Sequence, residues 1–331
     1  MIGLIACNQH SKNIFAEREV LIEKFKEERK LVYEIFLSEI YGYFDIVSLN
    51  DQLLLFSRLR ENLFTVYDTQ GDSIGSFGTI GQGPNELLNN RWTGQSNIDS
   101  TGNKIWINDV SNARLVEINI TKSLIENHCV FEKIIKTPSL SINCFFDNDS
   151  ILIIEQQGAQ NYKLFGVNTL SNNNLFNQDV YLKNSENPFS IYKSIINVNS
   201  KFTKVLFVMQ SLNMVNIFDI ETMNRKSFVI DKSYRPMLVN ALDRNTKLPK
   251  WVYYIDAVAT TDRIYTLYLN QSYEESFAVE KEMEIHVFSW DGEALFRYKI
   301  DNYLEAIAVD EKNQYIYGLG LDEILYKYKI D

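Results

Sequence analysis

Six polar residues stand inside apolar segments of the chain and could together form a binding or metal site. In four of these segments the polar residue lies six positions before the polar residue of the next turn, as Asp45 does before Asp51. Asn197 and Glu305 fit less closely, because the turns after them differ. The full set is Asp45, Asn97, Asn143, Asn197, Asp256 and Glu305. Such residues are unusual within a strand unless that face meets water or a ligand.

Two interpretations of this set stay open. Three carboxylates and three amides offer only oxygen ligands, which suit a hard cation such as calcium or magnesium. Asp45, Asp256 and Glu305 would then be the metal ligands, with Asn143 and Asn197 as metal or substrate contacts. Alternatively, the six residues line a hydrated channel. The three histidines lack metal-ligand spacing, and no Ser, His and Asp arrangement can be nominated for nucleophilic catalysis.

The elements that would bring these residues together are revealed by an internal repeat. An apolar residue followed by Asp, Asn or Ser ends a strand-like segment at positions 68, 119, 168, 219, 289 and 331, at intervals of 51, 49, 51, 70 and 42. The interval of 70 marks an insertion, which we assign to residues 232–250 and 270–282. Two more strands precede each landmark. Six units of four strands predict an all-β, six-bladed β-propeller, whose innermost strands line the central channel.

The two ends of the chain are predicted to complete this ring. The last unit stops one strand short, and the orphan apolar run Leu31–Ser38 can supply that outer strand. Before it, Ile14, Leu21 and Phe25 recur at offsets of seven and four, which predicts one amphipathic helix over residues 13–30. The predicted organisation is therefore a tether at 1–12, a helix at 13–30 and a propeller at 31–331.

One hairpin and the corner after it carry a family resemblance. The hairpin is TVYDTQGDSIGSFG, and the corner is Gly81-Gln82-Gly83-Pro84-Asn85-Glu86. Together with the lipobox-like Leu4-Ile5-Ala6-Cys7, they resemble the bacterial six-bladed, TolB-like propeller lipoproteins. The resemblance implies a propeller exported to the cell envelope, and it brings no catalytic residues with it. The corner lacks the fingerprint of a nucleotide-binding loop, so we expect its glycines to turn the chain toward the next blade rather than form an anion-binding nest.

Charge and the N-terminus limit the partners. A net charge of −10 without a basic block argues against nucleic acid. Lipidation of Cys7 would anchor the protein in the envelope, as its only contact with the membrane. If Met1 is the true start, the secretion signal is incomplete and the expected localisation is cytoplasmic.

We therefore expect a monomeric, non-enzymatic propeller that binds a glycan, peptide or protein partner on the face with the inter-blade corners. Trp92, just after the corner, is a candidate aromatic contact, with packing under the loop as the alternative. The alternative function is a metal-dependent, lactonase-like hydrolase with calcium or magnesium in the channel. No other cofactor is expected.

Overall fold

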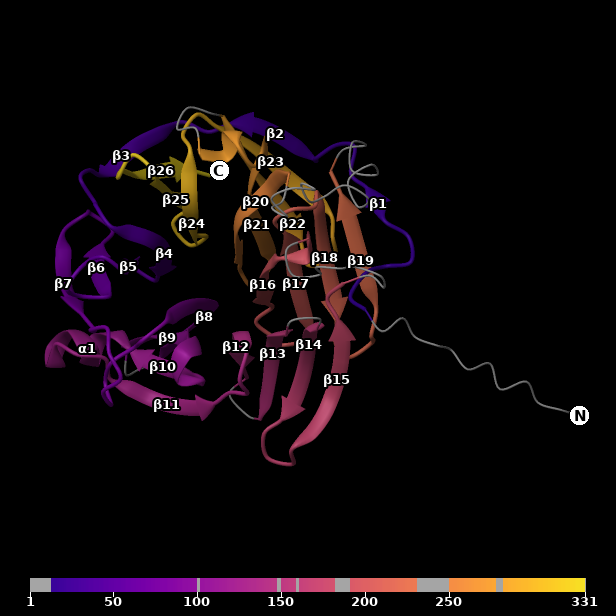
Figure 1. The fold of residues 1–331 in the computed structure, drawn as a ribbon. Helices are drawn as coiled ribbons and strands as arrows, with labels where there is room; N and C mark the ends of the chain where they lie inside the picture. The colour runs from indigo at the N-terminus through magenta and orange to yellow at the C-terminus, as the bar shows by residue number, and fades with distance from the viewer. Residues whose placement is uncertain are drawn as a thin grey trace, which may run out of the picture.

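The computed structural model describes residues 13–99, 102–147, 150–158, 161–181, 191–230, 250–277 and 282–330, which form six β-sheets around a central axis (Figure 1). Each sheet is one blade, in which consecutive strands run antiparallel from the innermost outward, and in blades 4 to 6 a strand from the N-terminal segment is added at the outer edge. The predicted six-bladed propeller is thereby confirmed. Cys7 and the tether at 1–12 lie outside the described residues.

The first three blades each consist of four consecutive strands. Blade 1 comprises β4 (Tyr43–Leu49), β5 (Gln52–Ser57), β6 (Phe64–Asp68) and β7 (Ser73–Phe77). Blade 2 comprises β8 (Asn90–Asp99), β9 (Gly102–Asp109), β10 (Arg114–Asn119) and β11 (Phe131–Lys136). Blade 3 comprises β12 (Ser141–Phe146), β13 (Ile151–Gly158), β14 (Asn161–Asn168) and β15 (Asn173–Asp179).

The last three blades also take strands from the N-terminal segment. Blade 4 comprises β16 (Ser194–Val198), β17 (Lys204–Met209), β18 (Met214–Asp219), β19 (Arg225–Val229) and β1 (Val20–Leu21). Blade 5 comprises β20 (Trp251–Ala259), β21 (Arg263–Ser272), β22 (Met283–Ser289), β23 (Ala294–Ile300) and β2 (Glu27–Lys30). Blade 6 comprises β24 (Leu304–Asp310), β25 (Tyr315–Gly320), β26 (Leu325–Lys329) and β3 (Tyr33–Leu37).

Short helical elements with bounds inside the described residues lie between strands. They are η1 (Val110–Asn112), α1 (Ile120–Glu126) and η3 (Glu275–Phe277). Helix α1 begins where the Asn119 side chain accepts a hydrogen bond from the Lys122 amide at 3.0 Å, which satisfies one of the free amides of its first turn. None of the helices in the described part of the chain has the length and apolar character needed to cross a membrane.

The repeat landmarks mark the third strand of every blade. In blades 1 to 5 that strand ends at Asp68, Asn119, Asn168, Asp219 and Ser289, and in blade 6 it ends at Lys329. A polar turn former is placed there because the chain must reverse at the rim of each blade. The predicted insertion at 232–250 lies almost wholly outside the described residues, and 270–272 prolong β21 instead of leaving the sheet.

The hydrophobic core lies between the blades. Six buried clusters fill the described part of the ring, each formed mainly by two neighbouring blades. Phe207 of blade 4, for example, lies with Phe145 and Leu164 of blade 3. Because the middle strands of each blade are covered on both faces, they read as continuous apolar runs such as Leu53–Phe56.

The predicted N-terminal helix at 13–30 is wrong, because this segment is extended. It runs along the outer edges of the blades as the indigo strand pieces of Figure 1, with β1 parallel to β19 and β2 parallel to β23. Ile14 and Phe25, which suggested one helix face, are buried in different clusters. An outermost strand leaves a row of unpaired backbone groups, and pairing with them outweighs the weak helical periodicity. We call residues 13–31 the strap.

The predicted ring closure is confirmed. Strand β3 pairs antiparallel with β26, with Tyr33 opposite Tyr328 and Leu37 opposite Leu325. Blade 6 is therefore built from the last three strands of the chain and one strand from its beginning.

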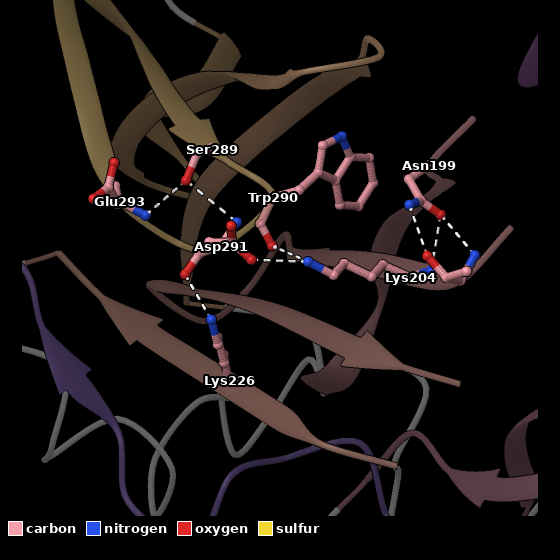
Figure 2. A network of polar contacts seen from close by, with 8 residues as sticks. Asn199, Lys204, Lys226, Ser289, Trp290, Asp291 and Glu293 are labelled. Atoms are coloured by element: carbon pink, nitrogen blue, oxygen red, sulfur yellow. Dashed lines mark hydrogen bonds and ion pairs between the residues drawn. The ribbon is translucent and has the colours of Figure 1, made fainter. Parts of the chain in front are cut away.

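Polar contacts also join neighbouring blades, as Figure 2 shows for blades 4 and 5. The ammonium of Lys204 donates to the Asp291 carboxylate at 2.9 Å, and Lys226 donates to the Asp291 carbonyl at 2.8 Å. Asp291 lies in the turn between β22 and β23, where Ser289 Oγ accepts the Asp291 and Glu293 amides. The turn of blade 5 is thus docked on the second and fourth strands of blade 4.

The glycine of this turn provides a test of the docking. Gly292 has φ +83°, and a Cβ there would lie 1.9 Å from Cζ of Phe228 in blade 4. The equivalent Gly71 of blade 1 has φ +93°, but its Cβ would meet Leu37 at 3.3 Å. We expect Gly71→Ala to cost about 1 kcal/mol from backbone strain and Gly292→Ala about 2–4 kcal/mol, since it adds a clash between blades. Urea unfolding measures both, and equal losses would contradict the docking.

Candidate functional site

A central cavity of about 710 Å³ is lined by the innermost strands of all six blades. Of the six predicted channel residues, five line it: Asp45, Asn97, Asn143, Asn197 and Asp256. The exception is Glu305, which is exposed to solvent and is not among the lining residues.

The position of Glu305 follows from the register of blade 6. A β-bulge interrupts the pairing of β24 with β25, so that Glu305 is skipped and Ala306 lies opposite Leu319. In blade 1 the bulge skips Phe44, and Asp45 is the next paired residue. The residue equivalent to Asp45 is therefore Ala306. A shift of one residue turns a side chain to the other face of the sheet, and counting from the turn cannot detect it.

Several of the channel side chains join one blade to the next. The Asp256 carboxylate accepts the Ile307 amide of blade 6 at 2.7 Å, and the Asn197 amide donates to the Ala257 carbonyl of blade 5 at 3.0 Å. Gln95, which the sequence did not single out, both donates to and accepts from the Phe146 backbone at 3.0 and 2.9 Å. Their polarity within apolar strands is explained partly by these bonds, which satisfy backbone groups where two blades meet.

Asp45 and Asp256 form a pair of carboxyl groups across the intervening blade 6. Burial is the main cause that raises the pKa of Asp45 to about 8, and the charge of Asp256 adds to it. Burial also raises the pKa of Asp256 to about 6, against the Ile307 and Ala257 amides that stabilise its charge. Asp256 has two amide donors and Asp45 has one, so the proton that the pair retains at neutral pH resides mainly on Asp45.

The predicted metal ligands are therefore not brought together as a set of three. Asp45 and Asp256 share the cavity, but Glu305 lies outside it. In the part of the chain that the structure describes, no three side chains of His, Cys, Asp or Glu gather where they could hold one metal ion.

A buried glutamate that the sequence analysis missed lies beside the cavity. Glu155, on the second strand of blade 3, is 1% exposed, and its two carboxylate oxygens accept hydrogen bonds from Asn143 and from the Tyr162 hydroxyl. Burial raises its pKa, while those two bonds and the charges of Arg91 and Lys193 act in the opposite direction. The sequence does carry a sign of this residue, because Glu155 directly follows the apolar run Ile151–Ile154. An acidic side chain in such a strand is rarely buried without partners.

The glycine corner turns the chain between blades, as expected. The Gly83 amide donates to the Glu86 carboxylate at 2.7 Å, and a Cβ at Gly81 would lie 2.0 Å from the same carboxylate. The loop thus folds around its own anion. Asp109 holds the following residues, because its carboxylate accepts the Leu88 and Asn89 amides at 3.2 and 3.1 Å.

Trp92 packs between two blades and also lines the central cavity. Its ring lies 6.1 Å from that of Phe56 in the cluster between blades 1 and 2, and it is also one of the residues that line the cavity. It is half-buried, so part of the indole is available to a ligand.

Comparison with known proteins agrees with this architecture. The model of the TolB-like 6-blade propeller family matches residues 31–312. A solved structure of a member of the DUF4221 family from Bacteroides vulgatus is 12% identical, with a TM-score of 0.58 over 91% of this chain and 97% of that one. A candidate exported protein from Bacteroides fragilis is 14% identical, with a TM-score of 0.58 over 94% of this chain and 100% of that one. A search of curated proteins found no match.

Proposed function

The chain belongs to the TolB-like 6-blade propeller family, and from this premise we propose that it is a binding propeller whose ligand site is the central cavity. The observation that carries the proposal is the cavity itself. Its volume of about 710 Å³ falls within the range of about 300–1,000 Å³ that is usual for small-molecule sites. It also combines aromatic side chains, such as Trp92, with amides and charged groups, a mixture suited to a hydrophilic ligand.

The mouth that we assign to the ligand is on the face with the inter-blade corners. The innermost strands begin at that face, since each receives the chain from the outermost strand of the blade before. A glycan or the end of a peptide could enter there, and the rim loops could contact the rest of a larger partner.

Thermal-shift measurements with a panel of mono- and oligosaccharides and short peptides test this site. A ligand at 100 times its Kd should stabilise the folded protein by about 2.7 kcal/mol, a rise of several degrees in Tm. Ser96→Trp, which places an indole at the cavity wall, should abolish the shift. Ser171→Trp, at an exposed turn of blade 3, should preserve it.

An equal shift in wild type and Ser96→Trp would place the site elsewhere and contradict the proposal. Recovery of the ligand after incubation also separates binding from the hydrolase alternative. A binding propeller returns the compound unchanged, whereas cleavage that is lost in Asp256→Asn and restored by calcium after chelation would favour the metal-dependent enzyme.

We place the protein in the cell envelope, with Cys7 as its lipidation site. The support is the lipobox-like tetrad at residues 4–7 and the structural similarity to a candidate exported protein. Labelling with a palmitate analogue, in cells that express the natural coding region, tests the anchor. Cys7→Ser should lose the label, and a label that persists in this variant would contradict the assignment.

A further inference from the structure

Three cationic side chains line the central cavity near one mouth. Arg58 directly follows β5, Arg91 is the second residue of β8, and Lys193 directly precedes β16. The second strand of a blade ends on the face where its innermost strand begins, so all three residues belong to the face with the inter-blade corners. They come from blades 1, 2 and 4 of a protein whose net charge is −10.

Arg91 and Lys193 are brought to the same side of the cavity by a close approach of blades 2 and 4. A Cβ on Gly94 of β8 would lie 2.0 Å from Oδ1 of Asn197 in β16, so these innermost strands meet across the channel. Arg91 precedes Gly94 by three residues, and Lys193 precedes Asn197 by four. Loss of solvent and then the charge of Arg91 lower the pKa of Lys193, as expected for two neighbouring cations.

These two cations have no ionic partner at contact distance within the described residues. Several other cationic side chains of the propeller are paired, as Arg114 is with Asp109 at 3.0 Å and Arg297 with Glu284 at 2.7 Å. Glu155 acts on Arg91 and Lys193 only at longer range, and its oxygens already accept bonds from Asn143 and Tyr162. Arg58 lies over the Phe44 ring, 4.1 Å from its centroid, near the largely protonated Asp45.

We propose that the central cavity binds a small hydrophilic anion, with a carboxylate or phosphate group held between Arg91 and Lys193. This inference rests on the proposed function, because it names the chemical class of ligand for the same site. A guanidinium and an ammonium can each donate charge-assisted hydrogen bonds to such a group. Trp92 offers an aromatic ring at the cavity wall, and the side chains of Asn97 and Asn143 offer polar contacts to hydroxyl groups.

Isothermal titration calorimetry with three matched sugars tests the proposal. Glucuronate carries a carboxylate, glucose 6-phosphate carries a phosphate, and glucose carries no charge. We expect at least one anionic sugar to bind about 10-fold or more tightly than glucose, and its affinity to fall as sodium chloride is raised. The preferred anionic sugar identifies the anion as carboxylate or phosphate.

Charge-removing variants locate the anion. Arg91→Gln and Lys193→Gln should each weaken binding of the anionic sugar about 10-fold, since each removes a charge-assisted contact. Lys201→Gln, an exposed lysine just beyond the other end of β16, removes the same charge and should leave binding unchanged. Circular dichroism checks that each variant is folded, and the salt dependence of the wild type does not rely on any variant.

Three results would overturn the inference: binding of glucose as tight as that of both anionic sugars, no binding of any of the three, or full affinity in both variants. If glucose bound as tightly as both anionic sugars and Ser96→Trp abolished that binding, the cavity would still be a ligand site, as the proposed function states. Only the inference that the ligand is an anion would be wrong.

Discussion

A chain that begins at Tyr41 is expected to lose the cooperative unfolding transition of the whole ring. It lacks the strap and β3, so the edge of β26 is exposed and three hydrophobic clusters lose part of their cover. Ile14, Phe15, Phe25 and Leu31 belong to those clusters and are at most 9% exposed. At about 1.5–3 kcal/mol for each side chain, their loss is worth about 6–12 kcal/mol, comparable with the total stability of about 5–15 kcal/mol of a typical domain.

Two further truncations separate the contributions. A chain that begins at Asn13 retains every described contact and should melt like the full chain. A chain that begins at Leu31 keeps β3 and closes blade 6, so it should still unfold cooperatively but at a lower temperature. Melting followed by circular dichroism, together with size-exclusion chromatography, distinguishes these outcomes. If the chain from Tyr41 melted like the full chain, closure by β3 would not stabilise the ring.

Stability should fall as the pH rises through the range in which Asp45 and Asp256 lose their shared proton. Both carboxyls ionise near pH 4 in the unfolded chain, whereas the folded protein keeps protons on the pair up to between about pH 6 and about pH 8. The folded state therefore binds more protons across this range, and the free energy of unfolding decreases with rising pH. The stabilisation by the pair is complete below about pH 4 and lost by about pH 8.

Asp45→Asn isolates this effect. The asparagine retains an oxygen for the Ile46 amide and carries no charge. We expect the variant to be more stable than the wild type at pH 8 by up to about 5 kcal/mol, because the pKa of Asp45 lies about four units above its value in the unfolded chain and each unit corresponds to about 1.4 kcal/mol. At pH 4 the variant should show little advantage. Urea unfolding at several pH values measures the difference between the two proteins.

Comparing the variant with the wild type cancels the contributions of the other buried titratable groups to the pH dependence of stability. His286 acts in the opposite sense, because burial lowers its pKa and the folded state loses stability on acidification. Asp51→Asn, which removes an exposed carboxyl of the same blade, should follow the wild-type curve. Parallel curves for Asp45→Asn and wild type would contradict the assignment of the shared proton.

The fold was predictable from the sequence because turn-forming residues recur at the same place in each repeat. Residues such as Asp68 and Asp219 stand where each third strand reverses, and the missing strand of blade 6 matched a run at the other end of the chain. The strap was mispredicted because its secondary structure is determined by the edges of blades 4 and 5, which are distant in sequence.

The candidate site was only partly predictable. The period of the repeat located Asp45 and Asp256. In blade 6 the turn after the innermost strand is longer, residues 311–314 against 50–51 in blade 1, so that counting back from it gave Glu305 instead of Ala306. The hydrogen-bond partners of these residues were not predictable either, since the contact of Asp256 with Ile307 depends on how blades 5 and 6 pack against each other. Nothing in the sequence distinguishes Arg91 and Lys193 from ordinary surface residues, because they are brought to one mouth by the approach of Gly94 to Asn197.

The pairing of β3 with β26 also determines when the ring can form. Tyr33 and Tyr328 lie opposite each other, 295 residues apart in the chain (328 − 33). A ribosome synthesises the chain from its N-terminus, so β3 emerges well before its partner. Blade 6 therefore cannot be completed until β26 has left the ribosome, after the strands of the other five blades. Individual blades can collapse earlier, but the closed ring and its complete central cavity form only after blade 6 is complete.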